Sequence, residues 1–293
     1  MTASLPIRVR VPASTANLGP GFDALGLALA LYDEVEVLPA ASGLRVEVHG
    51  QGAGTLPTDQ THRVVRALHA ACARCGYRPG GLVLRCHNSI PQGRGLGSSA
   101  AAAVAGVLAG YALAGMEPGG AALDLAAELE GHADNAAASL LGGLVICWRD
   151  QRCFRAVRLE PHPDLAPVLL VPPAASATDE TRAMLPVQVP HADAAFTAGR
   201  AALLVHALTA APQLLLAATE DRLHQPYRRP AYPATVGLVE QLRTAGVPAA
   251  VSGAGPAVLA LPPQGRLPGG VDHRGFAAYR LDVARGGARV ACG

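Results

Sequence analysis

The sequence predicts an α+β fold, because strand and helix patterns occur in mixed order without strict βαβ alternation. Stretches with period-two apolar spacing lie between alanine- and leucine-rich stretches with helical spacing. The 293 residues, half of them hydrophobic, are enough to bury one large or two modest cores. Prolines crowd the sequence just after residue 160. We therefore expect an N-terminal domain over residues 1–160 and a C-terminal domain over residues 161–293.

In the first half, apolar alternation predicts strands, and apolar spacing of three and four predicts helices. The expected strands cover residues 5–12, 32–38, 44–48, 81–86, 144–148 and 154–159. The expected helices cover residues 61–76, 98–113 and 118–130, with a short alanine helix after Asn135. Between the first two strands, residues 13–23 hold glycine and proline, and we expect a loop there that carries Asn17 and Asp23.

In the second half, prolines and glycines separate shorter elements. The expected strands are 168–171, 249–251 and 257–261, with two short ones within 276–291. The expected helices are 191–210 and 233–245.

All 24 basic residues are arginines, and this absence of lysine excludes several mechanisms. A Walker A loop, a protein-kinase site and a pyridoxal phosphate site each need a lysine. If the protein handles phosphate, it must use backbone amides, arginine and metal ions.

Charge and hydropathy exclude further classes of function. The net charge of +2 without a basic block does not indicate nucleic acid binding, and no uninterrupted apolar run is long enough for a membrane span. No secretion signal is visible at the start, so we expect the protein in the reducing cytoplasm.

Cys72 and Cys75 form a C-x-x-C pair, which fits a redox motif or half a zinc site. We interpret them as ordinary helix cysteines, because no second ligand pair lies nearby.

A glycine-rich stretch over residues 91–108 dominates the first half. Glycines at 93, 95 and 97 can turn their backbone N–H groups toward one point, and Ser98 and Ser99 are expected to cap the following helix. The positive end of the helix dipole then favours an anion, most naturally phosphate.

Two other interpretations of this stretch stay open. One is a plain strand-to-helix connection. The other is a dinucleotide-binding turn with Glu117 as its acidic residue, but residues 88–91 separate the glycines from the strand, and Glu117 opens a helix before Pro118.

Residues 91–100 resemble the phosphate-loop motif of the GHMP kinase superfamily. Further motifs resemble one family of that superfamily, the homoserine kinases. These motifs are residues 11–26, 129–135 with 142–143, 178–186, 224–228 and 251–256. The resemblance implies a two-domain fold, with an N-terminal ATP-binding domain and a C-terminal ferredoxin-like α+β domain. It also implies transfer of the γ-phosphate of Mg-ATP to the side-chain hydroxyl of L-homoserine, on the route to threonine. A homodimer is expected, because the family is commonly dimeric.

The resemblance also assigns residues. It implies that ATP is bound by Pro91, Gly93, Arg94, Gly95, Leu96, Gly97, Ser98, Ser99 and Ala100, with His62 near adenine where the family often has asparagine. It implies Ser98 and Glu130 as Mg²⁺ ligands. It implies that homoserine is bound by Asn17, Asp23, His132, Asn135, Arg182 and Arg228, with Asp23, Glu130 and Arg182 as the catalytic set.

Three of these assignments have an alternative, which is a neighbouring residue in two of them and a second role for the same residue in the third. Glu128 lies two positions before Glu130 and is expected to be a solvated helix residue. Arg229 could replace Arg228 only if the local register differs. Asp23 is the natural general base, although a loose phosphoryl-transfer transition state needs little activation of the nucleophile.

Two alternative functions remain. A sister GHMP enzyme acting on mevalonate-type or sugar alcohols is disfavoured by the arginine pair and the first motif. A non-catalytic ligand sensor is disfavoured by Glu130, Ser98 and the intact glycine loop.

Overall fold

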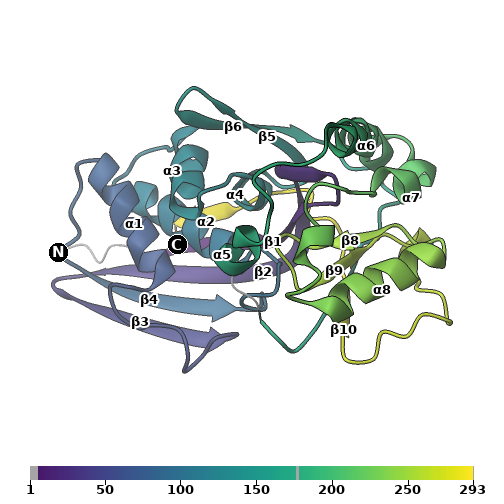
Figure 1. Ribbon diagram of the computed structural model, residues 1–293. Coiled ribbons are helices and arrows are strands. Elements are labelled where there is room, and N and C mark those ends of the chain that lie inside the picture. Colours follow the sequence, from purple (N-terminus) through teal and green to yellow (C-terminus); the bar gives the residue numbers. More distant parts are fainter. Residues whose placement is uncertain (1–5, 176–177, 293) are drawn as a thin grey trace.

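The computed structural model describes residues 6–175 and 178–292 and contains two β-sheets flanked by helices (Figure 1). The seven-stranded sheet is built from β1 (Ile7–Asn17), β2 (Gly21–Ala40), β3 (Gly43–Gly50), β4 (Gly81–Asn88), β5 (Leu144–Asp150), β6 (Cys153–Leu159) and β11 (Arg289–Cys292). Its main path runs β11-β1-β2-β4-β3, and the β5–β6 hairpin joins it through β2. The four-stranded sheet has the order β10-β7-β9-β8 and contains β7 (Val168–Val171), β8 (Ala249–Val251), β9 (Val258–Ala260) and β10 (Ala277–Arg280).

Four helices lie on one face of the larger sheet (Figure 1). They are α1 (Arg63–Arg74), α2 (Ser98–Leu113), α3 (Ala121–Glu130) and α4 (Asp134–Leu141). Small residues let α2 pack closely against α1: a Cβ at Gly106 would lie 2.3 Å from the Val64 carbonyl oxygen, and one at Gly110 would lie 2.6 Å from that of Leu68. The alanine-rich sequence of α2 therefore reflects a helix buried on nearly all sides.

The remaining helices accompany the second half of the chain. They are α5 (Thr178–Ala183), α6 (His191–Thr209), α7 (Leu215–Ala218) and α8 (Pro233–Thr244), with short 3₁₀ turns η1 (Pro212–Leu214), η2 (Pro226–Arg228) and η3 (Pro263–Gly265). Helix α8 packs Val236, Val239 and Leu242 in a cluster with Val251 and Val258 of the smaller sheet. No helix among the described residues is both long and apolar enough to span a bilayer.

Most elements expected from the sequence are confirmed, including the helix at 98–113 and the strands at 168–171 and 249–251. The open loop expected over residues 13–23 is wrong. Strand β1 continues to Asn17 and β2 starts at Gly21, so the turn is short. Residues 13–16 are small and buried on both faces, which removes the alternation that would have revealed a strand.

The end of the described chain returns to the first sheet. Strand β11 pairs with β1 in antiparallel register, from Ile7 opposite Cys292 to Arg10 opposite Arg289. The larger core also includes Leu169 and Leu259 of the smaller sheet. The boundary at residue 160 stays a prediction, and the pairing of β11 shows that the larger sheet draws on residues from both sides of it.

Candidate active site

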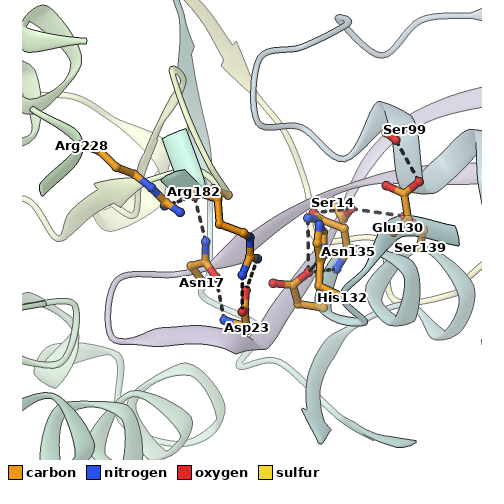
Figure 2. A network of polar contacts seen from close by, with 12 residues as sticks. Ser14, Asn17, Asp23, Ser99, Glu130, His132, Asn135, Ser139, Arg182 and Arg228 are labelled. Carbon is orange, nitrogen blue, oxygen red and sulfur yellow. Dashed lines mark hydrogen bonds and ion pairs between the residues drawn. The ribbon is translucent and has the colours of Figure 1, made fainter. Parts of the chain in front are cut away.

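A cavity of about 500 Å³ lies between the glycine loop, the β1–β2 turn and the loop after β8. Its walls come from both halves of the chain. The lining residues that the sequence predicted are Asn17, Asp23, Gly93, Arg94, Gly95, Leu96, Gly97, Ser98, Ser99, Ala100, Glu130, His132, Asn135, Arg182 and Arg228. Figure 2 shows Arg182 and Arg228 with Asn17 and Asp23 toward one end, Glu130 with Ser99 toward the other, and Asn135 with His132 between them.

Two predicted residues, Pro91 and His62, do not line this cavity. His62 is buried at the start of α1, and its Nδ1 has no hydrogen-bond partner among the described residues. Burial lowers the pKa of His62, against an opposing effect of Asp59. A contact between His62 and adenine therefore stays a prediction.

The glycine loop takes a left-handed backbone at three positions, with φ of +63° at Gly93, +78° at Gly95 and +69° at Gly97. A Cβ at Gly95 would lie 2.2 Å from the Ser252 carbonyl oxygen, and one at Gly97 would lie 2.1 Å from Ser14 Oγ. Glycine is thus required both by the conformation and by the close contacts.

The start of α2 differs from the expected serine cap. Gly97 is the N-cap residue, no side chain in the described part of the chain caps the helix, and Ser98 and Ser99 are already helical. The physical reason is the left-handed Gly97, which carries the chain into the helix without a capping side chain. The first turn of α2 consequently faces the cavity without a side-chain cap, as an anion-binding helix start does.

Glu130 lies at the end of α3, and its side chain is only 6% exposed. Ser99 Oγ donates a hydrogen bond of 2.9 Å to Glu130 Oε1, and Arg63 forms an ion pair with the same carboxylate. Sequence reasoning missed Arg63, although it directly follows His62 in a stretch already considered for nucleotide contact. Glu128, by contrast, is 47% exposed and pairs with Arg74, as expected of a solvated helix residue.

Ser98 and Glu130 both line the cavity and offer the hard oxygen atoms that Mg²⁺ prefers. Within the described residues there is no group of three or more His, Cys, Asp or Glu side chains that could hold a metal ion. Mg²⁺ is usually held by one or two protein groups together with phosphate oxygens and water, and a magnesium site at Ser98 and Glu130 stays a prediction.

Arg94 uses its guanidinium to join the loop to the end of β7. Its Nε donates to the Pro172 carbonyl at 3.1 Å, its Nη1 donates to the Gln92 carbonyl at 2.6 Å, and its Nη2 donates to the Pro173 carbonyl. Arg94 thus lines the cavity, but each of its three guanidinium nitrogens donates to a backbone carbonyl. The position predicted for phosphate contact therefore also links the two sheets.

Asn17 and Asp23 flank the β1–β2 turn, and both have a left-handed backbone, with φ of +67° and +55°. Asn17 Oδ1 accepts a 3.0 Å bond from the Asp23 N–H, and Asn17 Nδ2 donates at 2.9 Å to the Gly253 carbonyl (Figure 2). Side chains in this backbone region cost free energy, which the surrounding contacts must offset.

Arg182 of α5 and Arg228 of η2 approach the same aromatic ring, that of Phe22. Their guanidinium carbons lie 5.3 Å and 5.6 Å from its centroid. Arg182 also donates to both carboxylate oxygens of Asp23. Sequence reasoning did not single out Phe22, although it immediately precedes Asp23.

Arg228 is 1% exposed, and no carboxylate of the described residues lies within ion-pair distance of it. Burial lowers its pKa, with the nearby Arg182 acting in the same direction and Tyr232, Asp23 and Asp221 opposing. Its neighbour Arg229 instead pairs with Glu240 away from the cavity. The structure thus places Arg228, rather than Arg229, at the cavity wall.

His132 and Asn135 form the wall between the two ends of the cavity (Figure 2). Asn135 Oδ1 accepts a 3.0 Å bond from Ser14 Oγ, and His132 Nδ1 lies 2.7 Å from Asp134 Oδ1. Burial lowers the pKa of His132, but the hydrogen bond to Asp134 and the charges of Asp134, Glu130 and Asp23 outweigh it and raise the pKa overall.

Comparison with known proteins shows which families and folds this chain is similar to. Residues 62–143 match the GHMP kinases N terminal domain, and residues 200–268 match the GHMP kinases C terminal domain. The chain is 52% identical to a homoserine kinase of Streptomyces avermitilis, over 97% of this chain and 95% of that protein. It is 56% identical to one of Streptomyces coelicolor, over 87% and 84%. Its fold is similar to the crystal structure of homoserine kinase from Cytophaga hutchinsonii, with a TM-score of 0.85 and 28% identity over 99% of both chains.

Proposed function

The chain belongs to the homoserine kinase family of the GHMP kinases, and from this premise we propose how its cavity carries out the family's reaction. The reaction transfers the γ-phosphate of ATP to the side-chain hydroxyl of L-homoserine and gives O-phospho-L-homoserine. Phosphoryl transfer depends mostly on positioning and on stabilising negative charge. The roles of the cavity residues follow from these two requirements.

The triphosphate of ATP binds at the glycine loop and the first turn of α2. This is supported by the left-handed glycines and by the helix start without a side-chain cap. Because the chain has no lysine, positive charge near the phosphates has to come from arginine and metal. Arg63 is the arginine that reaches Glu130 at this end of the cavity.

Ser98 and Glu130 would hold Mg²⁺ beside the phosphates. When bound, the ion neutralises negative charge on the phosphoryl oxygens. The contacts with Ser99 and Arg63 orient the Glu130 carboxylate and restrict the rotation of its side chain.

The homoserine carboxylate binds at Arg228 and Arg182, and the observation that carries this assignment is the buried Arg228. A buried cation without an anionic partner is costly unless a ligand supplies the opposite charge. The fork-shaped guanidinium suits a carboxylate. Phe22 keeps both guanidinium groups within reach of one ligand.

Asn17, Asp23 and Asn135 hold the ammonium and hydroxyl groups of homoserine, with His132 beside them. Asp23 offers acceptor oxygens and Arg182 offers donors, so together they complement a zwitterion. We assign Asp23 to binding, because its carboxylate is already oriented by Arg182 and a loose transition state needs little help from a base.

An ADP-release assay with ATP and Mg²⁺ tests this function. L-homoserine, L-serine, mevalonate and galactose are compared as acceptors, and turnover is expected with L-homoserine in strong preference to the others. Turnover with mevalonate or galactose instead would point to a sister kinase. ATP binding without turnover of any acceptor would point to a ligand sensor.

The same proposal includes assembly and compartment. Trp148 and Val157 are exposed on the β5–β6 hairpin, which supports a homodimer that covers them. All six cysteines are free thiols, which supports a reducing cytoplasm. Light scattering of the purified protein measures its oligomeric state, and a fluorescent fusion in cells shows its compartment.

A further inference from the structure

We propose that His224 is a positioning residue that holds Arg228 in place and joins it to the turn carrying Asn17 and Asp23. His224 lies just before η2, is fully buried and does not line the cavity. The inference rests on the proposed function, in which Arg228 binds the homoserine carboxylate. It adds a residue that controls this binding without touching the substrate.

The two ring nitrogens of His224 contact the two halves of the homoserine site. Nδ1 lies 2.9 Å from Arg228 Nη1, and Nε2 lies 2.7 Å from the Gly19 carbonyl oxygen. A guanidinium can only donate and a carbonyl can only accept. Nδ1 must therefore be the acceptor and Nε2–H the donor, which fixes a neutral imidazole in one tautomer.

The surroundings hold the ring in this orientation. It stacks on Phe22 with centroids 5.0 Å apart and an interplanar angle of 29°. Asp221 accepts hydrogen bonds from the backbone N–H groups of residues 223, 224 and 225, and so fixes the chain that carries the ring. A Cβ at Gly19 would lie 2.5 Å from the Thr219 carbonyl oxygen, so the turn itself packs against the chain after α7.

A neutral acceptor has a specific advantage beside Arg228. An aspartate or glutamate at position 224 would also orient the guanidinium, but it would neutralise the charge that the homoserine carboxylate needs. An amide carries its acceptor and donor on a single carbon and a hydroxyl carries both on a single atom, whereas imidazole accepts on one side of the ring and donates on the other. Histidine thus orients the arginine, leaves its charge available and fixes its position relative to Asn17 and Asp23.

Two substitutions separate the contacts of the ring. His224→Asn can place an amide oxygen near the position of Nδ1 and keep the acceptor for Arg228. His224→Gln can place an amide N–H near Nε2, keeping the bond to Gly19 but removing the acceptor. We expect the KM for L-homoserine to rise about 10-fold or more in His224→Gln and less than about threefold in His224→Asn, with the KM for ATP unchanged in both.

Controls distinguish positioning from general destabilisation. Leu242→Ala removes buried volume from α8 in the core of the smaller sheet, and is expected to lower Tm without changing the KM for L-homoserine. Equal effects of His224→Gln and His224→Asn on the KM for L-homoserine, or a rise in KM that follows Tm across all three variants, would overturn the inference.

Arg228→Met and the double variant with His224→Gln complete the test. If His224 acts through Arg228, the double variant binds L-homoserine no more weakly than Arg228→Met alone. Independent, multiplicative losses would overturn the role of His224 and leave that of Arg228 standing. An unchanged KM for L-homoserine in Arg228→Met would instead refute the proposed carboxylate site, and with it the inference.

Discussion

Arg182 donates two parallel hydrogen bonds to Asp23, with Nη1 2.8 Å from Oδ2 and Nη2 2.7 Å from Oδ1. The two residues are 159 positions apart and come from α5 and the start of β2. This pairing brings a donor fork and an acceptor carboxylate to one end of the cavity. A zwitterion carries the complementary groups, and each partner can be tested through its affinity for homoserine.

Asp23→Asn keeps the size of the side chain but removes its negative charge. We expect the KM for L-homoserine to rise about 10- to 100-fold, because a hydrogen bond to a charged group is lost, and the KM for ATP to stay the same. Steady-state kinetics with each substrate varied in turn measures both values. A fall in kcat by orders of magnitude at constant KM would show that Asp23 acts as a general base.

Glu130→Gln removes the carboxylate proposed to hold Mg²⁺. We expect activity to fall sharply and to be partly restored by high Mg²⁺, because the weakened site fills again by mass action. The matched control is Glu128→Gln, which changes an exposed carboxylate two residues earlier on the same helix. Titration of activity with Mg²⁺ compares the variants, and coinciding titration curves for Glu130→Gln and the unmodified enzyme would remove Glu130 from the metal site.

Gly97→Ala introduces a Cβ that would lie 2.1 Å from Ser14 Oγ, at a φ of +69°. We expect ATP binding to weaken by at least about 10-fold, because the loop must shift to relieve the contact. Gly115→Ala is the matched control: its φ is +68°, and a Cβ there meets no atom of residues 6–175 or 178–292 within 4 Å. It should cost stability of about 1 kcal/mol through the backbone alone and leave ATP affinity unchanged. Calorimetric titration with ATP measures the affinity of each variant. Equal losses of ATP affinity in Gly97→Ala and Gly115→Ala would show that the contact with Ser14 is not the cause.

His132 predicts a pH dependence of stability. Its pKa in the folded protein lies above the ordinary 6.5, so its protonated form stabilises the fold. This contribution is fully present below about 6.5 and disappears as pH rises through the folded pKa. We expect the difference in Tm between the unmodified protein and His132→Gln to be larger at pH 5.5 than at pH 8. His69→Gln, at an exposed position of α1, serves as control. A larger difference in Tm at pH 8 than at pH 5.5 would contradict a raised pKa of His132.

The sequence predicted the longer helices and the second-half strands well, because their patterns are local, but it did not predict the short helices α5 and α7. Helix α2 follows from its alanine run, and the strands near 168 and 249 follow from short apolar runs bounded by proline or glycine. The extension of β1 to Asn17 was not predictable in this way. Residues 13–16 are buried on both faces, with Ser14 bonded to Asn135 and Thr15 bonded to Ser252, and their small side chains carry no period.

Most residues that line the cavity were predictable from motifs, but Arg63 and the contacts that each residue makes were not. Nothing local indicates that Arg63 reaches Glu130, that Arg94 donates to carbonyls after β7, or that Ser99 rather than Ser98 contacts Glu130. Such contacts depend on how helices and loops pack in three dimensions. The absence of a serine cap on α2 likewise follows from the backbone of Gly97, which residue type alone does not determine.

The pairing of β11 with β1 has a consequence for how the protein is made. Residues 289–292 are synthesised after every strand of the smaller sheet, yet they cover the edge of β1 in the larger one. While the chain is still on the ribosome, that edge, with Ile7 and Val9, offers unpaired backbone groups to other chains. The half of the molecule that holds the glycine loop is therefore translated first but completed last.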